Sequence, residues 1–486
     1  MFAWLVNTLA TQKDIDKYNQ SAYHRSAALR AGKNTSMKLN WVLLNSTAAA
    51  SLGGLLFGFD TAVISGATQS LTQLFHLTPA SLGVTVSSAL WGTVLGACCG
   101  GLVGDRLGRR NGLRLIALSY VISALGCALA WNWSSLVFFR VIGGIAIGAS
   151  SVIGPMYIAE IAPARYRGRL VGLFQFNVVF GILIAYVSNY LVGLIFSPAN
   201  WRLKLGIAAL PAALFLLSLT SIPQSPRWLV KMGRLEEARA TLVRIGEENV
   251  DRELRDIADS VQAAGATEGL FTKRYLLPIF LAISIGMFNQ LSGINAILYY
   301  LNDIFARAGF TSVSSDIQAV VIGLMNLVAT IVAMSIIDKI GRRKLLLIGS
   351  VACAASLAGV SWVFFSGAHG VLLLWFLTSF ICFFSFSQGA VIWVYISEIF
   401  PNTVRGKGQS LGSFSHWFMN AIVSGIFPVM AASSGGYPFV FFALMMVLQF
   451  FIVFFFYPET QRISLEELER KLGFGRPVAS EASRVS

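Results

Sequence analysis

The chain has 486 residues, of which 55% are hydrophobic and only 12% charged, and its mean hydropathy is +0.67. Soluble domains carry about 25% charged residues, so this composition excludes an ordinary soluble protein. The net charge of +14 would indicate nucleic-acid binding in a soluble chain. The positions of the basic residues, described below, argue against that function here.

Apolar stretches of about 20 residues recur along the chain, and each is long enough to cross a bilayer as a helix. The five cysteines all lie inside these stretches, without disulfide or metal spacing, so we expect no metal site and no cofactor. The pattern predicts an all-α membrane protein whose twelve transmembrane helices lie at 41–67, 81–103, 113–131, 135–158, 169–194, 203–221, 275–300, 317–337, 345–365, 370–396, 408–431 and 438–457.

Basic residues gather in alternate connections, whereas the connections at 68–80, 132–134 and 432–437 are short and nearly uncharged. This is the positive-inside pattern, which places the basic connections and both termini in the cytoplasm. The basic excess therefore reflects topology in the cell membrane rather than nucleic-acid binding. Residues 1–36 show no cleavable signal peptide and are either a cytosolic tail or an upstream extension from a misassigned start.

Two motifs occur once in each half of the chain. GDRLGRR at 104–110 recurs as IDKIGRR at 337–343, and YIAEIAP at 157–163 recurs as YISEIFP at 395–401. Similar offsets indicate two parallel six-helix halves related by pseudo-symmetry. We expect a cytosolic N-terminal segment, a bundle, a small cytosolic helical domain, a second bundle, and a tail with a short helix, at 1–40, 41–222, 223–273, 274–457 and 458–486.

Further motifs follow in order: RVIGGIAIG at 140–148, PQSPRWL at 223–229, QLSGIN at 290–295, and PET at 458–460 before LEEL at 465–468. With the two GRR loops, they make the chain resemble the sugar porter family of the major facilitator superfamily over about 41–470. The resemblance implies two bundles that rock around a central monosaccharide site. It also implies helix breaks at Gly293 and Gly389. We expect the chain to function as a monomer.

Polar side chains inside the spans suit a sugar pocket, because hydroxyl groups need donors and acceptors and a pyranose face needs an apolar platform. Lone intramembrane amides usually join helices, and the alternative for Trp393 is a lipid-facing anchor at the membrane interface. The family motif favours sugar binding for Gln175, Gln290, Asn295 and Trp393. Asn326 stays open between these roles. His416 is either a hydrogen-bonded bundle residue or a donor to a sugar hydroxyl. The expected substrate-binding residues are Gln175, Asn289, Gln290, Asn295, Asn326, Trp393, His416 and Asn420.

Charged residues at the cytoplasmic helix ends predict a gate. We expect Glu160 to pair with Arg167, and Glu398 with Arg405, as interbundle ion pairs that hold the outward-open state. The alternative is that these residues only anchor the topology. The expected gating residues are Asp105, Arg109, Glu160, Arg167, Asp338, Arg342, Glu398 and Arg405.

Asp60 lies near the outer end of the first span, where a charge costs roughly 3 kcal/mol unless it is paired or protonated. The helical rise places Asp60 and Arg140 at similar depth in the outer half of the membrane. Arginine favours the carboxylate and desolvation favours the acid, so the pair can load and release a proton. In the family an acid at this place marks proton symporters. Arg140 could instead only cap backbone carbonyls.

The sequence therefore predicts a proton-coupled symporter of a hexose or pentose, working by alternating access in the cell membrane. An uncoupled sugar facilitator is the nearest alternative, and uptake assays with and without a proton gradient would separate the two. A sugar sensor is less favoured because such proteins carry long cytosolic extensions. An enzyme is least favoured because no nucleophile–base pair or phosphate loop is evident.

Overall fold

The computed structural model describes residues 40–461, apart from 164–165, 198, 264–268, 368–369 and 402. Every regular element among these residues is helical. The elements are α2 (Trp41–Val63), η1 (Ile64–Gly66), α3 (Thr68–Phe75), α4 (Pro79–Leu107), α5 (Arg109–Ala128), α6 (Trp133–Ile161), α7 (Arg167–Ile195), α8 (Trp201–Gly206), α9 (Ala209–Ser218), α10 (Pro226–Lys231), α11 (Leu235–Arg244), α12 (Val250–Ala263), η2 (Lys273–Tyr275), α13 (Leu276–Leu291), α14 (Ile294–Tyr299), α15 (Leu301–Arg307), α16 (Ser312–Ile340), α17 (Arg342–Ser366), α18 (Val371–Phe384), η3 (Ser385–Gly389), α19 (Ala390–Glu398), α20 (Arg405–Ser433) and α21 (Tyr437–Phe456).

Twelve helical segments in this described part are long and apolar enough to cross a membrane, which confirms the predicted number. Several spans are composite, because α8 and α9 form one, α13 and α14 another, and α18, η3 and α19 a third. The first 36 residues and the tail helix expected at 465–468 lie outside the described residues.

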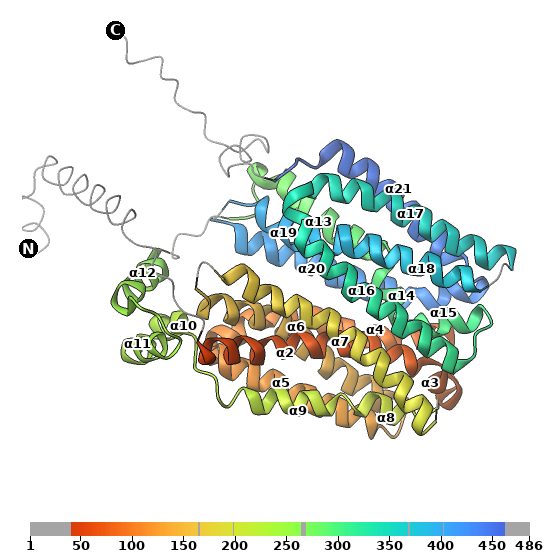
Figure 1. The fold of residues 1–486 in the computed structure, drawn as a ribbon, viewed down its shortest axis with the longest axis horizontal. Helices are drawn as coiled ribbons and strands as arrows, with labels where there is room; N and C mark the ends of the chain where they lie inside the picture. Colours follow the sequence, from red (N-terminus) through yellow and green to blue (C-terminus); the bar gives the residue numbers. More distant parts are fainter. Residues whose placement is uncertain are drawn as a thin grey trace, which may run out of the picture.

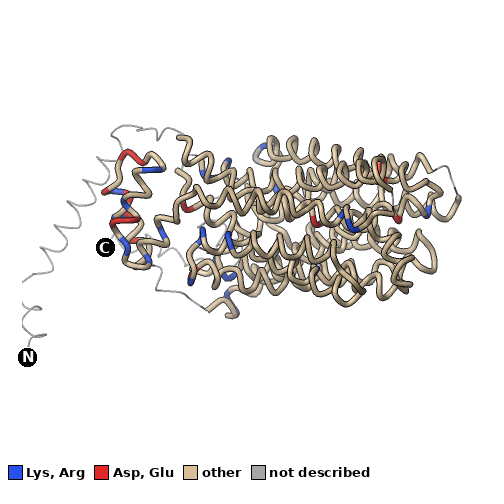
Figure 2. Tube along the Cα trace, turned by 90° about the horizontal axis from the view of Figure 1, so that it is seen from below, with Lys and Arg blue, Asp and Glu red and all other residues tan. Residues whose placement is uncertain are grey.

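The spans form two bundles that lie side by side, with α2–α9 in the first and α13–α21 in the second (Figure 1). The short helices α10–α12 lie at one end of the molecule, where charged residues gather (Figure 2). We call this end the basic end; it carries the arginines of the two GRR motifs at 108–110 and 341–343. The far end carries the connections at 76–78, 129–132 and 434–436.

Local sequence fixes where the helices start. Asn40 caps α2 by accepting a hydrogen bond from the Leu43 amide at 2.8 Å, and Asn132 caps α6 in a capping box with Ser135. At the basic end, Gly108 and Gly341 join α4 to α5 and α16 to α17 with φ angles of +82° and +99°. Only glycine adopts such angles without strain, so the repeated motif makes the same tight turn in each bundle.

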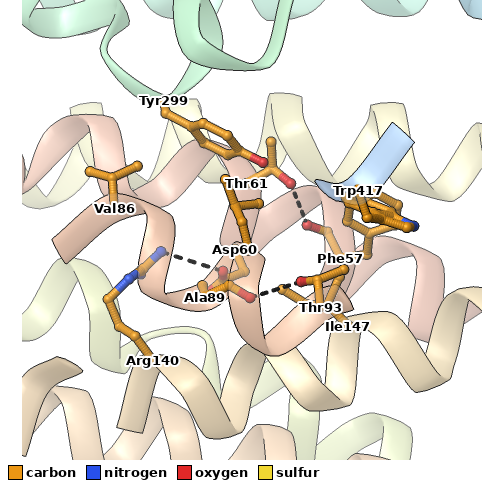
Figure 3. Close-up of a pocket in the computed structure, with 11 residues that line it drawn as sticks. Phe57, Asp60, Thr61, Val86, Ala89, Thr93, Arg140, Ile147, Tyr299 and Trp417 are labelled. Atoms are coloured by element: carbon orange, nitrogen blue, oxygen red, sulfur yellow. Dashed lines mark hydrogen bonds and ion pairs between the residues drawn. The ribbon is translucent and has the colours of Figure 1, made fainter. Parts of the chain in front are cut away.

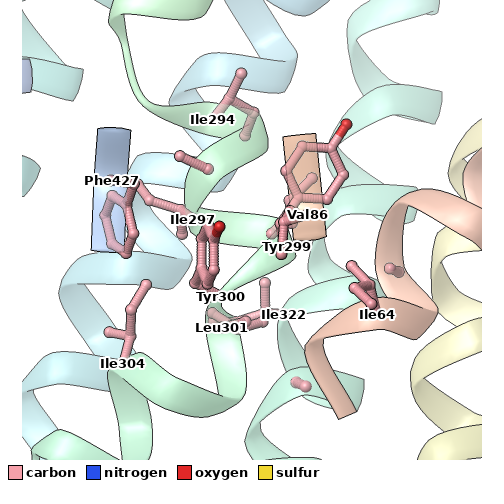
Figure 4. Packing of buried hydrophobic residues seen from close by; sticks show 14 of the residues in the cluster. Ile64, Val86, Ile294, Ile297, Tyr299, Tyr300, Leu301, Ile304, Ile322 and Phe427 are labelled. Atoms are coloured by element: carbon pink, nitrogen blue, oxygen red, sulfur yellow. The ribbon is translucent and has the colours of Figure 1, made fainter. Parts of the chain in front are cut away.

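The apolar cores show how the bundles meet. One cluster draws residues from both bundles toward the far end, where Ile64 and Val86 pack near Tyr299, Leu301 and Ile322 (Figure 4). Toward the basic end the first bundle has a core of its own and so does the second. The two bundles are therefore packed together at the far end, while each has a separate core at the basic end.

Small residues allow close helix contacts inside the bundles. On α6, Gly144 faces the backbone of α4, and a Cβ added there would clash with the carbonyl of Ala89. Such approaches bring α4 and α6 close enough for dispersion contacts along their length, which is how transmembrane helices associate in lipid.

We expect Gly144→Ala to destabilise the fold, because backbone atoms cannot move aside as a flexible side chain would. Overpacking of this kind costs about 1–3 kcal/mol. The control is Gly101→Ala on α4, where no atom lies within 4 Å of the added Cβ. The melting temperature in detergent should fall by several degrees for Gly144→Ala and stay level or rise for Gly101→Ala. Equal melting temperatures would show that this contact is not tight.

The predicted break in the seventh span is present. Between α13 and α14, Gly293 has a φ angle of +83°, and a Cβ there would meet the ring of Phe442. The tenth span behaves differently from the prediction, because Gly389 has a helical φ of −61° and the helix continues. Instead of a break, residues Ser385–Gly389 form a π-helical turn, a feature frequent at functional sites.

Candidate functional site

The structure brings Asp60 and Arg140 together. The Arg140 Nη2 atom lies 3.8 Å from Asp60 Oδ2 (Figure 3). The arginine Nε donates to the Thr85 carbonyl at 3.1 Å. The Arg140 side chain is 3% exposed, whereas that of Asp60 is 28% exposed. The arginine is therefore held in place by the backbone of α4, and the carboxylate keeps access to the space beside it.

That space lies between the bundles. A small cavity beside Asp60 is lined by Phe57 and Thr61 of α2 and by Tyr299 and Trp417 of the second bundle (Figure 3). The Phe57 and Trp417 rings meet with their centroids 5.3 Å apart. A second cavity borders Asp60 inside the first bundle. The carboxylate thus stands at the interface that a rocking motion would open and close.

Gln290 is the centre of a polar cluster in the second bundle. It is 1% exposed, and its Nε2 lies 3.0 Å from Asn289 Oδ1 and 3.2 Å from His416 Nε2. Its Oε1 accepts a hydrogen bond from Asn295 Nδ2 at 3.1 Å. Asn289 in turn reaches the Gln388 carbonyl beside the π turn at 3.5 Å. The helix break at Gly293 lets side chains from both segments of the seventh span join this cluster.

Aromatic rings flank the same cluster. The indole of Trp393 is 38% exposed, and its ring lies 5.2 Å from the imidazole of His416. One helical turn along α20, Asn420 is fully buried and its Nδ2 lies 3.4 Å from the Tyr299 hydroxyl. This combination of amides with a partly exposed indole offers hydrogen bonds to hydroxyl groups and an apolar face for a ring.

Two predicted binding residues lie apart from the cluster. Asn326 on α16 accepts a hydrogen bond from Ser385 at 2.7 Å, so its oxygen joins α16 to the π turn. Gln175 is partly buried on α7 of the first bundle. Among the other six predicted binding residues, each has a ring or hydrogen-bond contact that connects it to Gln290, to His416 or to Tyr299.

Sequence reasoning did not select Tyr299, Trp417 or Gln388 as site residues. Tyr299 and Trp417 border the Asp60 cavity, and the buried amide of Gln388 approaches the Met446 sulfur at 3.0 Å. The sequence does offer a sign of Tyr299, because Tyr299 and Tyr300 form a pair shortly after the QLSGIN motif. Trp417 follows His416 directly, but helical geometry turns it toward the opposite bundle instead of toward Trp393.

The acids at the basic end have other partners than expected. Glu160 pairs with Arg109 at 2.9 Å, and Glu398 pairs with Arg342 at 3.0 Å, each within its own bundle. Arg167 is exposed, and Arg405 donates to the Phe400 carbonyl at 3.3 Å. These pairs replace the expected pairs of Glu160 with Arg167 and of Glu398 with Arg405. In each bundle the acid pairs with the first residue of the helix that begins in the GRR motif.

The Glu160–Arg109 and Glu398–Arg342 pairs each belong to a hydrogen-bond network, and the segment that follows each bundle contributes further hydrogen bonds to it. In the first bundle, Ser225 Oγ donates to Glu160 at 2.5 Å and the Tyr157 hydroxyl donates to the Pro223 carbonyl. In the second, Thr460 Oγ1 donates to Glu398 at 2.6 Å and Tyr395 donates to the Pro458 carbonyl. In each half, therefore, the PQS or PET motif supplies a hydroxyl group to the glutamate and a proline carbonyl to the tyrosine.

Asp105 links the first bundle to the short helices. It accepts from Arg109 and from Lys231 of α10, each at 2.9 Å, while its backbone carbonyl accepts from the Trp228 indole. The side chain of Asp338, its counterpart in the second motif, lies outside the described side chains.

Comparison with known proteins places these features in a family. The model of the family "Sugar (and other) transporter" matches residues 46–472. The D-xylose-proton symporter of Escherichia coli (strain K12) is 34% identical over 475 residues, covering 90% of this chain and 96% of that symporter. The arabinose-proton symporter of Bacillus subtilis (strain 168) is 37% identical over 449 residues, with 90% and 96% covered. The inward open structure of the xylose transporter XylE from E. coli is 34% identical, with a TM-score of 0.80, covering 88% of this chain and 99% of that one.

Proposed function

The chain belongs to the family of sugar (and other) transporters, and we propose that it carries a monosaccharide together with a proton across the cell membrane by alternating access. The observation that carries the proton part is the Asp60–Arg140 pair at the interface of the bundles. A charged carboxyl group inside a span costs free energy. Its protonation can drive transport only if protons reach it from one side of the membrane and leave it to the other.

The proposed sugar site is the cluster around Gln290. Its amides donate and accept hydrogen bonds, and Trp393 supplies an exposed aromatic face on which a pyranose ring packs. We include His416 and Asn420, and we assign Gln175 and Asn326 to the edges of the site. The two relatives carry xylose and arabinose, so the sugar proposed for this chain is a pentose or a hexose.

The proposed orientation places the basic end and both termini in the cytoplasm, as the positive-inside rule requires. The shared core then closes the outer side in this structure, and the separate cores at the basic end leave the bundles free to part on the cytoplasmic side. Glu160 and Glu398 pair within their own bundles in this structure, and we propose that they contact the opposite bundle when the cytoplasmic gate closes. One chain supplies both halves, so we infer that a monomer is the working unit.

The test is sugar uptake into proteoliposomes, with xylose, arabinose and glucose offered singly, with and without an imposed proton gradient. We expect accumulation above the external concentration only with the gradient, together with alkalinisation of the medium when sugar is added. Normal uptake without alkalinisation would instead establish the uncoupled facilitator. No uptake of any monosaccharide would contradict a sugar carrier.

A further inference from the structure

Two opposite charges are buried against each other at the far end. Lys204 lies on α8 of the first bundle and Asp316 on α16 of the second, and each side chain is 2% exposed. The Lys204 Nζ and Asp316 Oδ2 atoms are 3.8 Å apart. Neither residue belongs to the proposed sugar or proton site, and the pair crosses the interface between the bundles.

Each member of the pair is held by its own bundle. Lys204 Nζ donates to the Gly66 carbonyl of η1 at 2.9 Å, and Asn302 Nδ2 donates to Asp316 Oδ1 at 2.5 Å. A third contact crosses the interface beside them, because the Tyr186 hydroxyl donates to the Leu298 carbonyl at 3.0 Å. Two rigidly placed charges therefore meet only when the bundles close at this end.

The energetics of a buried ion pair suit a reversible contact. Desolvation of the two charges offsets most of their attraction, so a complete pair contributes little net stability. Removing one partner leaves the other buried without compensation, which is strongly unfavourable. The closed arrangement thus depends on both charges being present, while separation into water costs little because both are then hydrated.

We propose that Lys204 and Asp316, positioned by Gly66 and Asn302, form the outer gate of the transport cycle. This inference rests on the alternating access of the proposed function. The gate also connects to the proton site, because Leu205 and Ala208 of the same span line the second cavity beside Asp60. A movement of α8 that separates the ion pair therefore changes the surroundings of Asp60.

The experiment measures the distance between spin labels at the far end by pulsed electron resonance, in a background without native cysteines. The labels replace Trp131 of the first bundle and Val371 of the second, which are 74% and 61% exposed. We expect Lys204→Met to raise the share of long distances, changing the ratio of open to closed molecules by about tenfold or more. Lys204→Arg, which keeps the positive charge and the donors toward Gly66 and Asp316, should keep the short distance.

The matched control is Arg202→Met. Arg202 is two residues away on α8, but its guanidinium donates to the Ala128 and Ala130 carbonyls within the first bundle. It should leave the distances unchanged. Equal distributions for Lys204→Met and Arg202→Met would overturn the gate. If Lys204→Met fails to fold, Asp316→Asn with the same labels provides the test. No sugar or gradient is needed, so a protein that shifts its distances but carries no sugar would refute the proposed function alone.

Discussion

Replacement of Asp60 by asparagine should abolish uphill accumulation of sugar while leaving sugar exchange largely intact. Asparagine keeps the size and polarity of the side chain but cannot bind or release a proton. The Arg140 guanidinium remains held by the Thr85 carbonyl, so the local fold should persist. Without a titrating group the bundles can still rock with sugar bound, but the gradient no longer drives them.

The measurement compares two assays on the same proteoliposomes. Accumulation against a gradient should fall until the internal and external sugar concentrations are equal, and counterflow of labelled sugar should continue. Full accumulation by the variant would remove Asp60 from the coupling mechanism. Loss of counterflow as well would place Asp60 in sugar binding or folding instead.

Asp303 offers a demanding control. It lies on α15, beyond the end of the seventh span, where burial raises the pKa of its carboxyl to about 6. It is therefore another acid that titrates near neutral pH and a rival for the role of proton carrier. Asp303→Asn should leave the accumulation ratio unchanged at pH 7. A loss of accumulation in this variant would transfer the coupling role from Asp60 to Asp303.

The second large effect is expected from Gln290→Ala. It should weaken sugar binding about 100-fold, because the loss of two hydrogen bonds to the sugar, at about 1–1.5 kcal/mol each, raises the binding free energy by about 2–3 kcal/mol. Gln290 contacts Asn289, Asn295 and His416, so its loss also frees the neighbours that it orients. Titration of the purified protein with sugar, followed by tryptophan fluorescence or calorimetry, gives the dissociation constant directly.

Gln449→Ala is the matched control for Gln290→Ala. Gln449 on α21 of the same bundle is also almost fully buried, at 2% exposure, and no hydrogen-bond contact in the described part of the chain joins it to Gln290. Its replacement should leave the dissociation constant unchanged. Similar weakening by the two variants would mean that the loss comes from general damage to the bundle, and unchanged binding in Gln290→Ala would remove it from the sugar site.

Features that depend on local sequence could be predicted. The spans follow from the length of the apolar stretches, whereas the break at Gly293 was implied by the family motif, which also implied a break at Gly389 that is absent. The similar depths of Asp60 and Arg140 needed only the rise of a helix and the alternation of span directions, and the structure adds their contact. These arguments use one dimension of the structure, the depth along the membrane normal.

Features that depend on rotation about the helix axes could not. Glu160 and Arg167 are near each other in sequence, yet Arg109 is the residue turned toward the acid. The ion pair of Lys204 and Asp316 escaped notice because each lies at the start of an apolar stretch, where a charge is ordinarily explained by contact with water. Only the packing of the two bundles shows that both side chains are enclosed.

The core that the two bundles share at the far end has a thermodynamic consequence. When this end opens, Ile64, Val86 and Ile322 lose their apolar neighbours and some of that surface meets water. Exposure of apolar surface raises the heat capacity, and the cost of exposure diminishes on cooling. Opening of the far end therefore carries its own heat-capacity change, and cooling lowers the free-energy cost of exposing this shared core.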